Sequence, residues 1–142
     1  MLANHGIDTE KAYSYEGKTG QCRFKRANST AALSRYAFVE PKDNALADAV
    51  NKMGPVAVMI DAAPKSFRFY QNGVYDDDQC SGELLTHGMS LTGFDLDNWH
   101  LRNSFGVEWG ELGTMRMTRA KGNICGILSR ATYPILEPKS AV

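Results

Sequence analysis

Two apolar runs joined by a polar turn constrain the fold of this chain more than any other feature of its sequence. The runs cover residues 86–94 and 99–103, and Asp95-Leu-Asp-Asn98 between them is a turn-forming segment. This arrangement predicts an antiparallel hairpin. A hairpin with its turn there places His87, at the start of the first strand, beside Asn103, at the end of the second.

The predicted neighbourhood of His87 and Asn103 has two interpretations. An Asn side-chain oxygen can accept a hydrogen bond from one imidazole N–H, which fixes the tautomer and leaves the other ring nitrogen for acid–base chemistry. A single His beside a strand can also be structural, and on spacing alone that is the more common case. The spacing therefore identifies a candidate pair without establishing its role.

The remaining segments predict one helix and further strands. Asp43 suits a helix N-cap, apolar residues follow at helical spacing, and Gly54-Pro55 ends the pattern, which predicts an α-helix at about residues 43–53. Val56–Ile60 is a continuous apolar run of the length of a buried strand. The other expected elements are strands at residues 35–40, 114–118 and 132–136 and a helical turn at residues 64–70. The fold class is therefore α+β, with a mainly antiparallel, strongly twisted sheet and one helix against it.

The length and the segment pattern predict a single domain over residues 1–136. The chain has 142 residues, which suffice for one domain with its own core. Within it, residues 1–30 are expected to be a connecting segment, of which residues 4–30 carry turn formers and charges and are expected to be extended surface chain. Residues 137–142 are expected to form a flexible tail.

The charge balance points away from nucleic acid and membranes as partners. Lys plus Arg and Asp plus Glu are present in equal numbers, 16 each, so no charge excess would attract polyanions. No apolar run approaches the length that spans a bilayer. The first residues lack the basic and apolar regions of a signal peptide.

No residue pattern predicts a metal or a cofactor. The three cysteines, Cys22, Cys80 and Cys125, are too far apart for a CxxC motif, and their odd number leaves at least one thiol unpaired. Asp76-Asp-Asp78 lacks the alternating oxygen ligands and the distal Glu of a calcium loop, so a solvated loop is expected there. Asn28-Ser-Thr30 is a glycosylation sequon, which matters only in a secreted protein.

The residues around His87 and Asn103 resemble the active-site segments of papain-like cysteine peptidases, and the cathepsin L branch most of all. The two central motifs are Thr86-His-Gly88 leading to Gly93-Phe94, and Asn103-Ser-Phe-Gly106 followed by Glu108-Trp-Gly-Glu111. Further matching motifs follow the family's order at Gly6–Glu10, Gly54–Val58, Gly73–Tyr75, Cys125–Ile127 and Tyr133–Pro134. The resemblance covers residues 4–136. It implies the right-hand, β-rich, half-barrel-like domain of a two-domain fold whose cleft holds the active site.

The resemblance also implies roles for residues of the site. His87 would be the general base and the imidazolium partner of a thiolate, and Asn103 would orient it. Phe105 stands where the family usually has a Trp that shields the Asn–His hydrogen bond. Trp109 keeps the family's aromatic residue on the prime side of the cleft, and Thr86 replaces an Asp that commonly precedes the His.

One further set of residues matches the wall of the pocket that receives the second residue before the cut: Met59, Leu85, Gly88 and Arg130. Arg130 is unusual, because small apolar residues are common at that position in this branch. Inside the pocket it would favour an acidic side chain, and otherwise it would point to solvent. Both alternatives remain open.

The resemblance pairs Cys80 with Cys125 in a disulfide and leaves Cys22 as a free thiol. In the family, the cysteine at the position of Cys22 forms a disulfide with the left-hand domain. The family's oxyanion Gln and its Gly-Ser-Cys-Trp-like nucleophile segment are absent from the 142 residues. No helix follows Cys22 to lower the pKa of its thiol, so it does not suit the role of nucleophile.

We therefore expect part of a papain-like cysteine endopeptidase, from a lysosomal or secreted parent protein, that is inactive alone for lack of the nucleophile. It would act on a peptide or protein substrate once a left-hand domain is supplied. The alternative is a truncated, non-catalytic paralogue that binds cystatin-type inhibitors, propeptides or a peptidase partner as a decoy. In both cases Met59, Leu85, Phe105 and Trp109 would lose their cover, which predicts self-association through an exposed domain interface. A stand-alone Cys/His metal or thiol site has no supporting spacing.

Overall fold

The computed structural model describes residues 2–136, so the tail predicted at residues 137–142 lies outside the described part. The contacts of the chain group into two compact units. Among the described residues, unit 1 comprises residues 2–37 and 134–136, and unit 2 comprises residues 38–133. The single domain expected over residues 1–136 stays a prediction.

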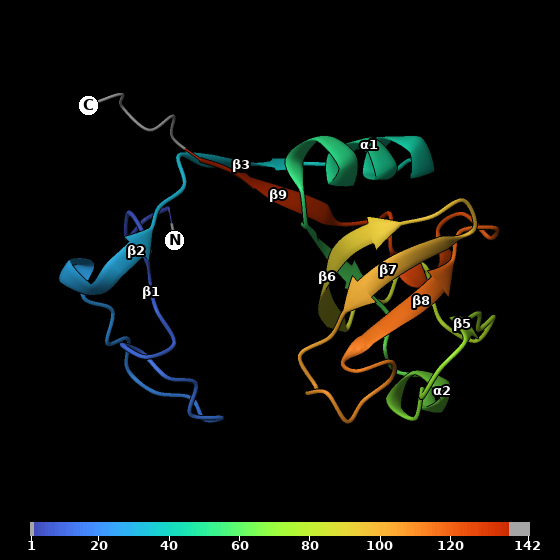
Figure 1. Cartoon of the computed structure of the whole chain (residues 1–142), viewed down its shortest axis with the longest axis horizontal. Coiled ribbons are helices and arrows are strands. Elements are labelled where there is room, and N and C mark those ends of the chain that lie inside the picture. Colours follow the sequence, from blue (N-terminus) through green and yellow to red (C-terminus); the bar gives the residue numbers. More distant parts are fainter. Residues whose placement is uncertain (1, 137–142) are drawn as a thin grey trace. The chain divides into compact units, whose positions relative to one another are not determined.

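Unit 1 contains a short antiparallel strand pair within otherwise irregular chain (Figure 1). Strand β1 (Ile7–Asp8) pairs with β2 (Ser29–Ala31), which follows the 3-10 turn η1 (Arg26–Asn28). A Cβ atom at Gly6 would lie only 1.8 Å from the Ser29 hydroxyl oxygen, so this close approach requires glycine. The segment expected to be extended surface chain therefore contains a strand pair. The sequence did not indicate this pair, because β1 has only two residues.

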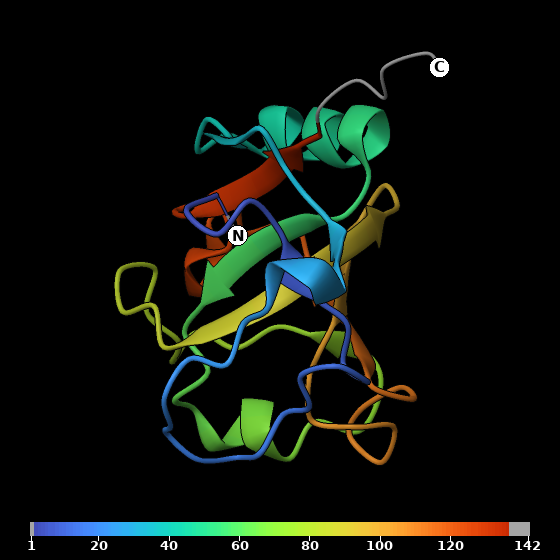
Figure 2. The same cartoon turned by 90° about the vertical axis from the view of Figure 1, so that its left-hand side faces the viewer.

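Unit 2 contains most of an open, mainly antiparallel sheet. Its strand order is β3-β9-β4-β6-β7-β8-β5, and the β9, β4 and β6 strands run side by side in red, green and yellow in Figure 2. The strands are β3 (Arg35–Phe38), β4 (Val56–Ile60), β5 (Val74–Tyr75), β6 (His87–Phe94), β7 (Asn98–Arg102), β8 (Thr114–Thr118) and β9 (Ala131–Ile135). The α+β class and the predicted hairpin, β6–β7, are confirmed.

The helices agree with the sequence patterns, with one correction. Helix α1 (Asp43–Met53) begins at Asp43, so the N-cap is Lys42 and the prediction of Asp43 as the cap is wrong by one residue. The Asp43 carboxylate instead accepts hydrogen bonds from Arg119, at 2.6 Å from Nη2 and 3.2 Å from Nε. Gly54 ends the helix at a φ of 92°, which favours glycine. The predicted helical turn is α2 (Lys65–Arg68).

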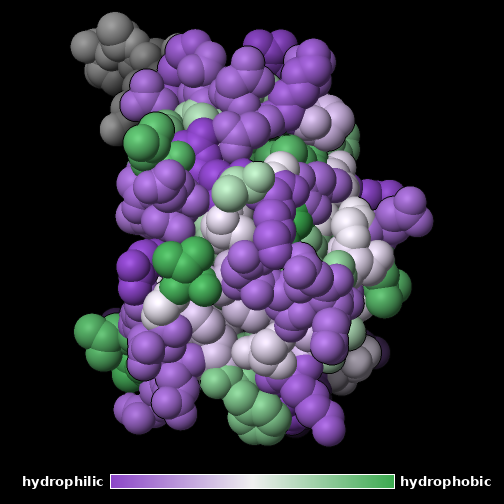
Figure 3. Space-filling model, turned by 90° about the vertical axis from the view of Figure 1, so that its right-hand side faces the viewer, coloured by the Kyte–Doolittle hydropathy of each residue, from purple (hydrophilic) through white to green (hydrophobic). Residues whose placement is uncertain are grey.

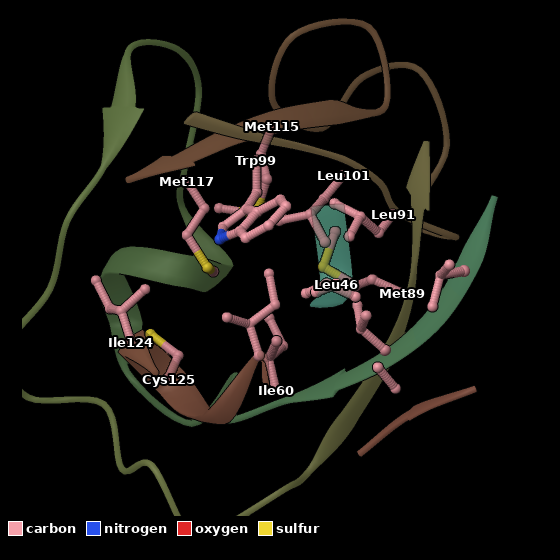
Figure 4. Packing of buried hydrophobic residues seen from close by; sticks show 14 of the residues in the cluster. Leu46, Ile60, Met89, Leu91, Trp99, Leu101, Met115, Met117, Ile124 and Cys125 are labelled. Atoms are coloured by element: carbon pink, nitrogen blue, oxygen red, sulfur yellow. The ribbon is translucent and has the colours of Figure 1, made fainter. Parts of the chain in front are cut away.

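The core lies on the inner face of the sheet and includes residues of α1, of α2 and of the 3-10 turn η2 (Ile124–Gly126) (Figure 4). Buried residues alternate with more exposed ones along β4, β6, β7 and most of β8, as the two-residue period of a strand requires. The indole of Trp99 is fully buried and lies toward the upper side of the cluster in Figure 4. Its neighbours in Figure 4 are Leu46, Ile60, Leu91, Leu101, Met115 and Met117. This packing holds β6 and β7, whose ends carry the candidate site, in a fixed register.

The surface shows the opposite pattern on the face drawn in Figure 3. Hydrophilic residues predominate there, and hydrophobic residues are scattered rather than joined in one continuous patch. Single exposed apolar residues of this sort are normal for a folded protein.

Candidate functional site

Strand register brings His87 and Asn103 together. His87 is the first residue of β6 and pairs with Ile60 of β4. Asn103 directly follows β7. The last paired residues of β6 and β7 toward this end are Ser90 and Arg102. The next pair in that register would join residues 89 and 103, so Asn103 and His87 lie diagonally on one face, within reach of their side chains.

The His87 imidazole and the Asn103 amide form a direct hydrogen bond. His87 Nε2 lies 2.9 Å from Asn103 Oδ1, and the backbone N–H of Ser104 donates to the same oxygen at 2.7 Å. Because Ser104 N–H can only donate, the amide atom that faces both groups is the oxygen. His87 Nε2 therefore carries a proton, and in the neutral imidazole Nδ1 is the nitrogen that can accept one.

Aromatic rings surround the imidazole. The Phe105 ring centroid lies 5.0 Å from that of His87, and the Phe67 centroid lies 5.5 Å away on α2. Asn103 is only 8% exposed, whereas Phe105 is 50% exposed. Phe105 thus lies against the imidazole, in the position expected for a ring that shields the Asn103–His87 hydrogen bond from water. The shielding itself stays a prediction.

Trp109 is buried, although it was expected to be an interface residue without cover. It is only 8% exposed, and its indole Nε1 donates to the backbone oxygen of Phe67 at 3.2 Å. The rings of Phe67 and Tyr70 lie 5.2 and 5.4 Å from it. The expectation was wrong for Trp109 because residues in and beside α2 cover it. Met59 and Leu85 are half-buried.

A hollow of about 520 Å³ lies on one side of the pair, and we call it the Arg130 hollow. It brings together Met59, Gly88 and Arg130, three of the four residues expected in one pocket wall, and Asn103 also lines it. Leu85 is not among its lining residues. It lies against Gly126, where a Cβ atom would be 2.5 Å from Leu85 Cδ2.

A second hollow, of about 1050 Å³, lies on the His87 side, and we call it the α2 hollow. Its described lining includes His87, Phe105 and Trp109 from the predicted site. The other lining residues are Ala62, Ala63, Lys65, Phe67, Arg68, Phe69, Tyr70, Gln71, Thr86 and Glu108. Sequence reasoning predicted the helical turn of α2 but missed its place beside His87, because no local pattern links the two segments.

Asp61 is a buried residue near the site that sequence reasoning also missed. It is 3% exposed and accepts hydrogen bonds from Ser81 N at 2.8 Å and from Ala63 N at 2.9 Å. The Thr86 hydroxyl, beside His87, also points to it at 3.4 Å. Asp61 thus ties the end of β4 to the residue before His87. An Asp after an apolar run was the only sequence signal for it.

The cysteines confirm the expected pairing. Cys80 and Cys125 form a disulfide with their Cα atoms 4.9 Å apart, and Cys22 is a free, exposed thiol in unit 1. Both cysteines of residues 38–133 are in the disulfide, so the unit that carries His87 holds no free thiol. The sequon residue Asn28 is exposed at the end of η1.

The acidic loop at residues 76–78 contacts a lysine. Lys121 Nζ lies 2.6 Å from Asp76 Oδ1 and 2.7 Å from Asp78 Oδ1. Within residues 2–136, no group of three or more His, Cys, Asp or Glu side chains is arranged to hold a metal ion. In the same residues, no helix is long and apolar enough to cross a membrane.

Comparison with known proteins links this geometry to one family. The sequence model of the papain family of cysteine proteases matches residues 1–135. Mouse cathepsin M is 40% identical over 142 residues, and the match covers 94% of this chain and 43% of that protein. Cathepsin L1 of Drosophila melanogaster is also 40% identical, over 139 residues, with 94% of this chain and 38% of that protein covered.

Solved structures agree with the sequence matches. Digestive procathepsin L 3 from the larval midgut of Tenebrio molitor superposes with a TM-score of 0.88 at 42% identity, covering 95% of this chain and 46% of that one. The Carica candamarcensis cysteine protease CMS1MS2, solved in complex with E-64, gives a TM-score of 0.84 at 28% identity. This chain spans less than half the length of cathepsin M, cathepsin L1 and procathepsin L 3.

Proposed function

Because this chain belongs to the papain family of cysteine proteases, we propose that His87 and Asn103 are the base half of a Cys-His-Asn site for thiol-dependent peptide hydrolysis. The observation that carries the proposal is the hydrogen bond between His87 Nε2 and Asn103 Oδ1, with the amide oriented by Ser104 N–H. It leaves His87 Nδ1 as the base.

The chemistry follows from that tautomer. His87 Nδ1 accepts the proton of a cysteine thiol, and the thiolate attacks the carbonyl carbon of the scissile peptide bond. The imidazolium then returns the proton to the leaving amine. Throughout, Asn103 Oδ1 holds Nε2–H and keeps the ring in one orientation, and Phe105 covers one side of it.

The nucleophile in this proposal comes from outside residues 38–133. Both cysteines there are in the disulfide, and Cys22 lies between the residues of β1 and η1 with no helix beginning at it. A catalytic thiolate is typically stabilised by a helix N-terminus or a nearby cation. The 142-residue chain therefore has no peptidase activity by itself.

The Arg130 hollow receives the second residue before the cut, and Arg130 favours an acidic side chain there. Arg130 is exposed, lines the hollow and forms no ion pair with another residue of 2–136. Since a free guanidinium binds a carboxylate well, peptide or protein substrates with Glu or Asp at that position are preferred. Met59 and Gly88 supply the rest of this wall.

The direct test adds a Cys-bearing half to the chain. The chain is mixed with the Cys-bearing half of a cathepsin L-like relative, and cleavage of a fluorogenic peptide is measured with and without reducing agent. The chain alone is expected to be inactive, and the mixture is expected to show thiol-dependent cleavage that His87→Ala abolishes. Cleavage by the chain alone, or cleavage that survives His87→Ala, contradicts the proposal.

A second candidate function is binding without catalysis. Unit 2 carries the cleft-side residues without a free thiol, and Phe105 is half exposed beside the α2 hollow. A decoy for cystatin-type inhibitors, propeptides or peptidase partners needs that surface and no nucleophile. Inhibitor binding by the chain, with no cleavage after the Cys-bearing half is added, supports this candidate over the first.

Location and self-association are parts of the same proposal. A disulfide such as Cys80–Cys125 persists in oxidising compartments, which supports a lysosomal or secreted parent protein. The exposed Phe105 and the half-buried Met59 and Leu85 favour association between copies of the chain. Sedimentation of the purified chain as a monomer at all concentrations counts against that association.

A further inference from the structure

We infer that the α2 hollow selects peptides with an acidic side chain on the carboxyl side of the scissile bond. This inference rests on the proposed function, because it assigns the substrate of the same site. Both hollows adjoin the His87–Asn103 pair, with Asn103 lining one and His87 the other. A substrate whose earlier residues occupy the Arg130 hollow therefore places its later residues in the α2 hollow.

Charge is the first argument for an acidic ligand. Lys65 and Arg68 both belong to α2, line the hollow and are exposed. Neither forms an ion pair with a carboxylate of residues 2–136. Glu108 is the one carboxylate among the described lining residues, and it pairs with neither cation. The charged side chains Lys65, Arg68 and Glu108 thus give the wall a net positive charge.

The residue beside the base adds no opposing charge. Thr86 lines the hollow next to His87 and is neutral. Its hydroxyl is directed to Asp61, which is buried, accepts three hydrogen bonds and does not line the hollow. A carboxylate in the hollow therefore meets two cations and one carboxylate, Glu108.

Aromatic rings in the α2 hollow add a preference for an apolar residue. Phe67 and Trp109 are buried in it, whereas Phe69 and Phe105 are 71% and 50% exposed. Exposed aromatic rings bind apolar side chains well. The favoured segment after the cut therefore combines an apolar residue, against these rings, with a Glu or Asp that reaches Lys65 or Arg68.

Solvent exposure keeps the expected preference moderate. An ion pair of exposed side chains changes binding by about two- to fivefold, so a Glu that reaches one or both cations is favoured over Gln by roughly two- to 25-fold. Peptides with Lys in place of Glu bind more weakly still. Because the cations are exposed, high salt reduces the difference.

The first experiment measures binding to the 142-residue chain and needs no catalysis. Short peptides, acetylated and amidated at their ends, are titrated into isotope-labelled chain and followed by NMR, with Glu, Gln or Lys at one position after an apolar residue. The expected order of affinity is Glu, Gln, Lys, with signal changes at residues 65–70 and 105–109. Equal affinities, absence of binding, or changes confined to other segments overturn the inference.

Matched variants assign the effect to the two cations. Lys65→Gln with Arg68→Gln is expected to remove the preference for Glu, and Glu108→Gln is expected to increase it. Lys52→Gln, which removes an exposed lysine of α1 that pairs with Asp48, is the control and leaves the preference unchanged. The NMR spectrum of each variant shows whether the fold is kept. A preference that survives the double variant overturns the inference.

The second experiment separates this inference from the proposed function. The chain joined with the Cys-bearing half of a relative is assayed on peptides with Glu, Gln or Lys after the cut. Cleavage in that order, through kcat/KM, supports both claims, and cleavage with no dependence on the residue supports only the proposed function. If no peptide is cleaved, the proposed function fails, and the binding experiment still decides the inference.

Discussion

His87 Nε2 lies 2.9 Å from Asn103 Oδ1, although the two residues are 16 positions apart in the chain. The β6–β7 hairpin creates this proximity, and Ser104 N–H determines which amide atom faces the ring. The pair is thus assembled by one supersecondary unit, and it forms without any residue from outside the chain.

Replacing the orienting amide should impair catalysis in the enzyme joined with a Cys-bearing half. Asn103→Ala removes the acceptor for His87 Nε2–H, so the ring loses its fixed tautomer, and kcat/KM should fall on the order of 10²-fold. Asn72→Ala, at an exposed position near α2, is the control and should change little. A loss of less than about twofold for Asn103→Ala would show that the amide does not orient the base.

The disulfide should contribute strongly to stability. Cys80 and Cys125 are separated by 45 residues, and closing a loop of that length stabilises the fold by about 4 kcal/mol on the chain-entropy model. Replacing both cysteines with Ser should lower the free energy of unfolding in urea by about that amount. Cys22→Ser should leave the free energy unchanged, and mass spectrometry after thiol labelling should count one free thiol in the unreduced chain.

The aromatic cluster under the site should depend on Phe67. Its side chain is 1% exposed and contacts the rings of Tyr75, His87 and Trp109, so Phe67→Ala should cost about 3–5 kcal/mol in unfolding experiments. Phe69→Ala is the matched control, because that ring is 71% exposed and its loss should cost less than about 0.5 kcal/mol. Equal costs would contradict this packing.

The β6–β7 turn should make stability depend on acid pH. The hydrogen bond from His100, and then that from the backbone N–H of Asp97, lower the pKa of Asp95 from 3.8 to about 2. A folded-state pKa below the unfolded value stabilises the protein above about pH 3.8, and this stability disappears as the pH falls toward 2. Asp95→Asn should therefore lower the melting temperature at neutral pH and weaken the decline below pH 3.8.

Asp97→Asn is the control for that experiment, since it changes a carboxylate of the same turn whose residue contacts Asp95 and Arg119 through its backbone N–H and C=O groups. Its melting temperature should follow that of the original chain through the acid range. An unchanged decline in Asp95→Asn would show that Asp95 is not the group responsible.

Local patterns predicted much of the fold. The helix that Gly54 ends, the buried run Val56–Ile60 and the β6–β7 hairpin all have signals within their own residues. The two-residue strand β5 was missed, because its parallel pairing with β8 arises from tertiary contacts rather than from a local period.

The sequence likewise predicted some features of the candidate site and not others. The positions of His87 and Asn103 followed from the hairpin, and the motifs around them indicated the family. The burial of Trp109 could not be predicted, since Phe67, which accepts its indole hydrogen bond, lies 42 positions away. Lys65 and Arg68 line the same hollow as His87 because of the tertiary position of α2, which no pattern along the chain contains.

The most direct test of the proposed site is to determine the tautomer of His87 in the chain without substitutions. Two-bond nitrogen–proton NMR correlations of the imidazole identify which ring nitrogen carries the proton in the neutral form, and His5 and His100 serve as internal references. The account predicts that Nε2 is protonated and Nδ1 is free, and that Asn103→Ala makes the two tautomers mix. A proton on Nδ1 in the original chain would contradict the assignment of His87 as a base held by Asn103.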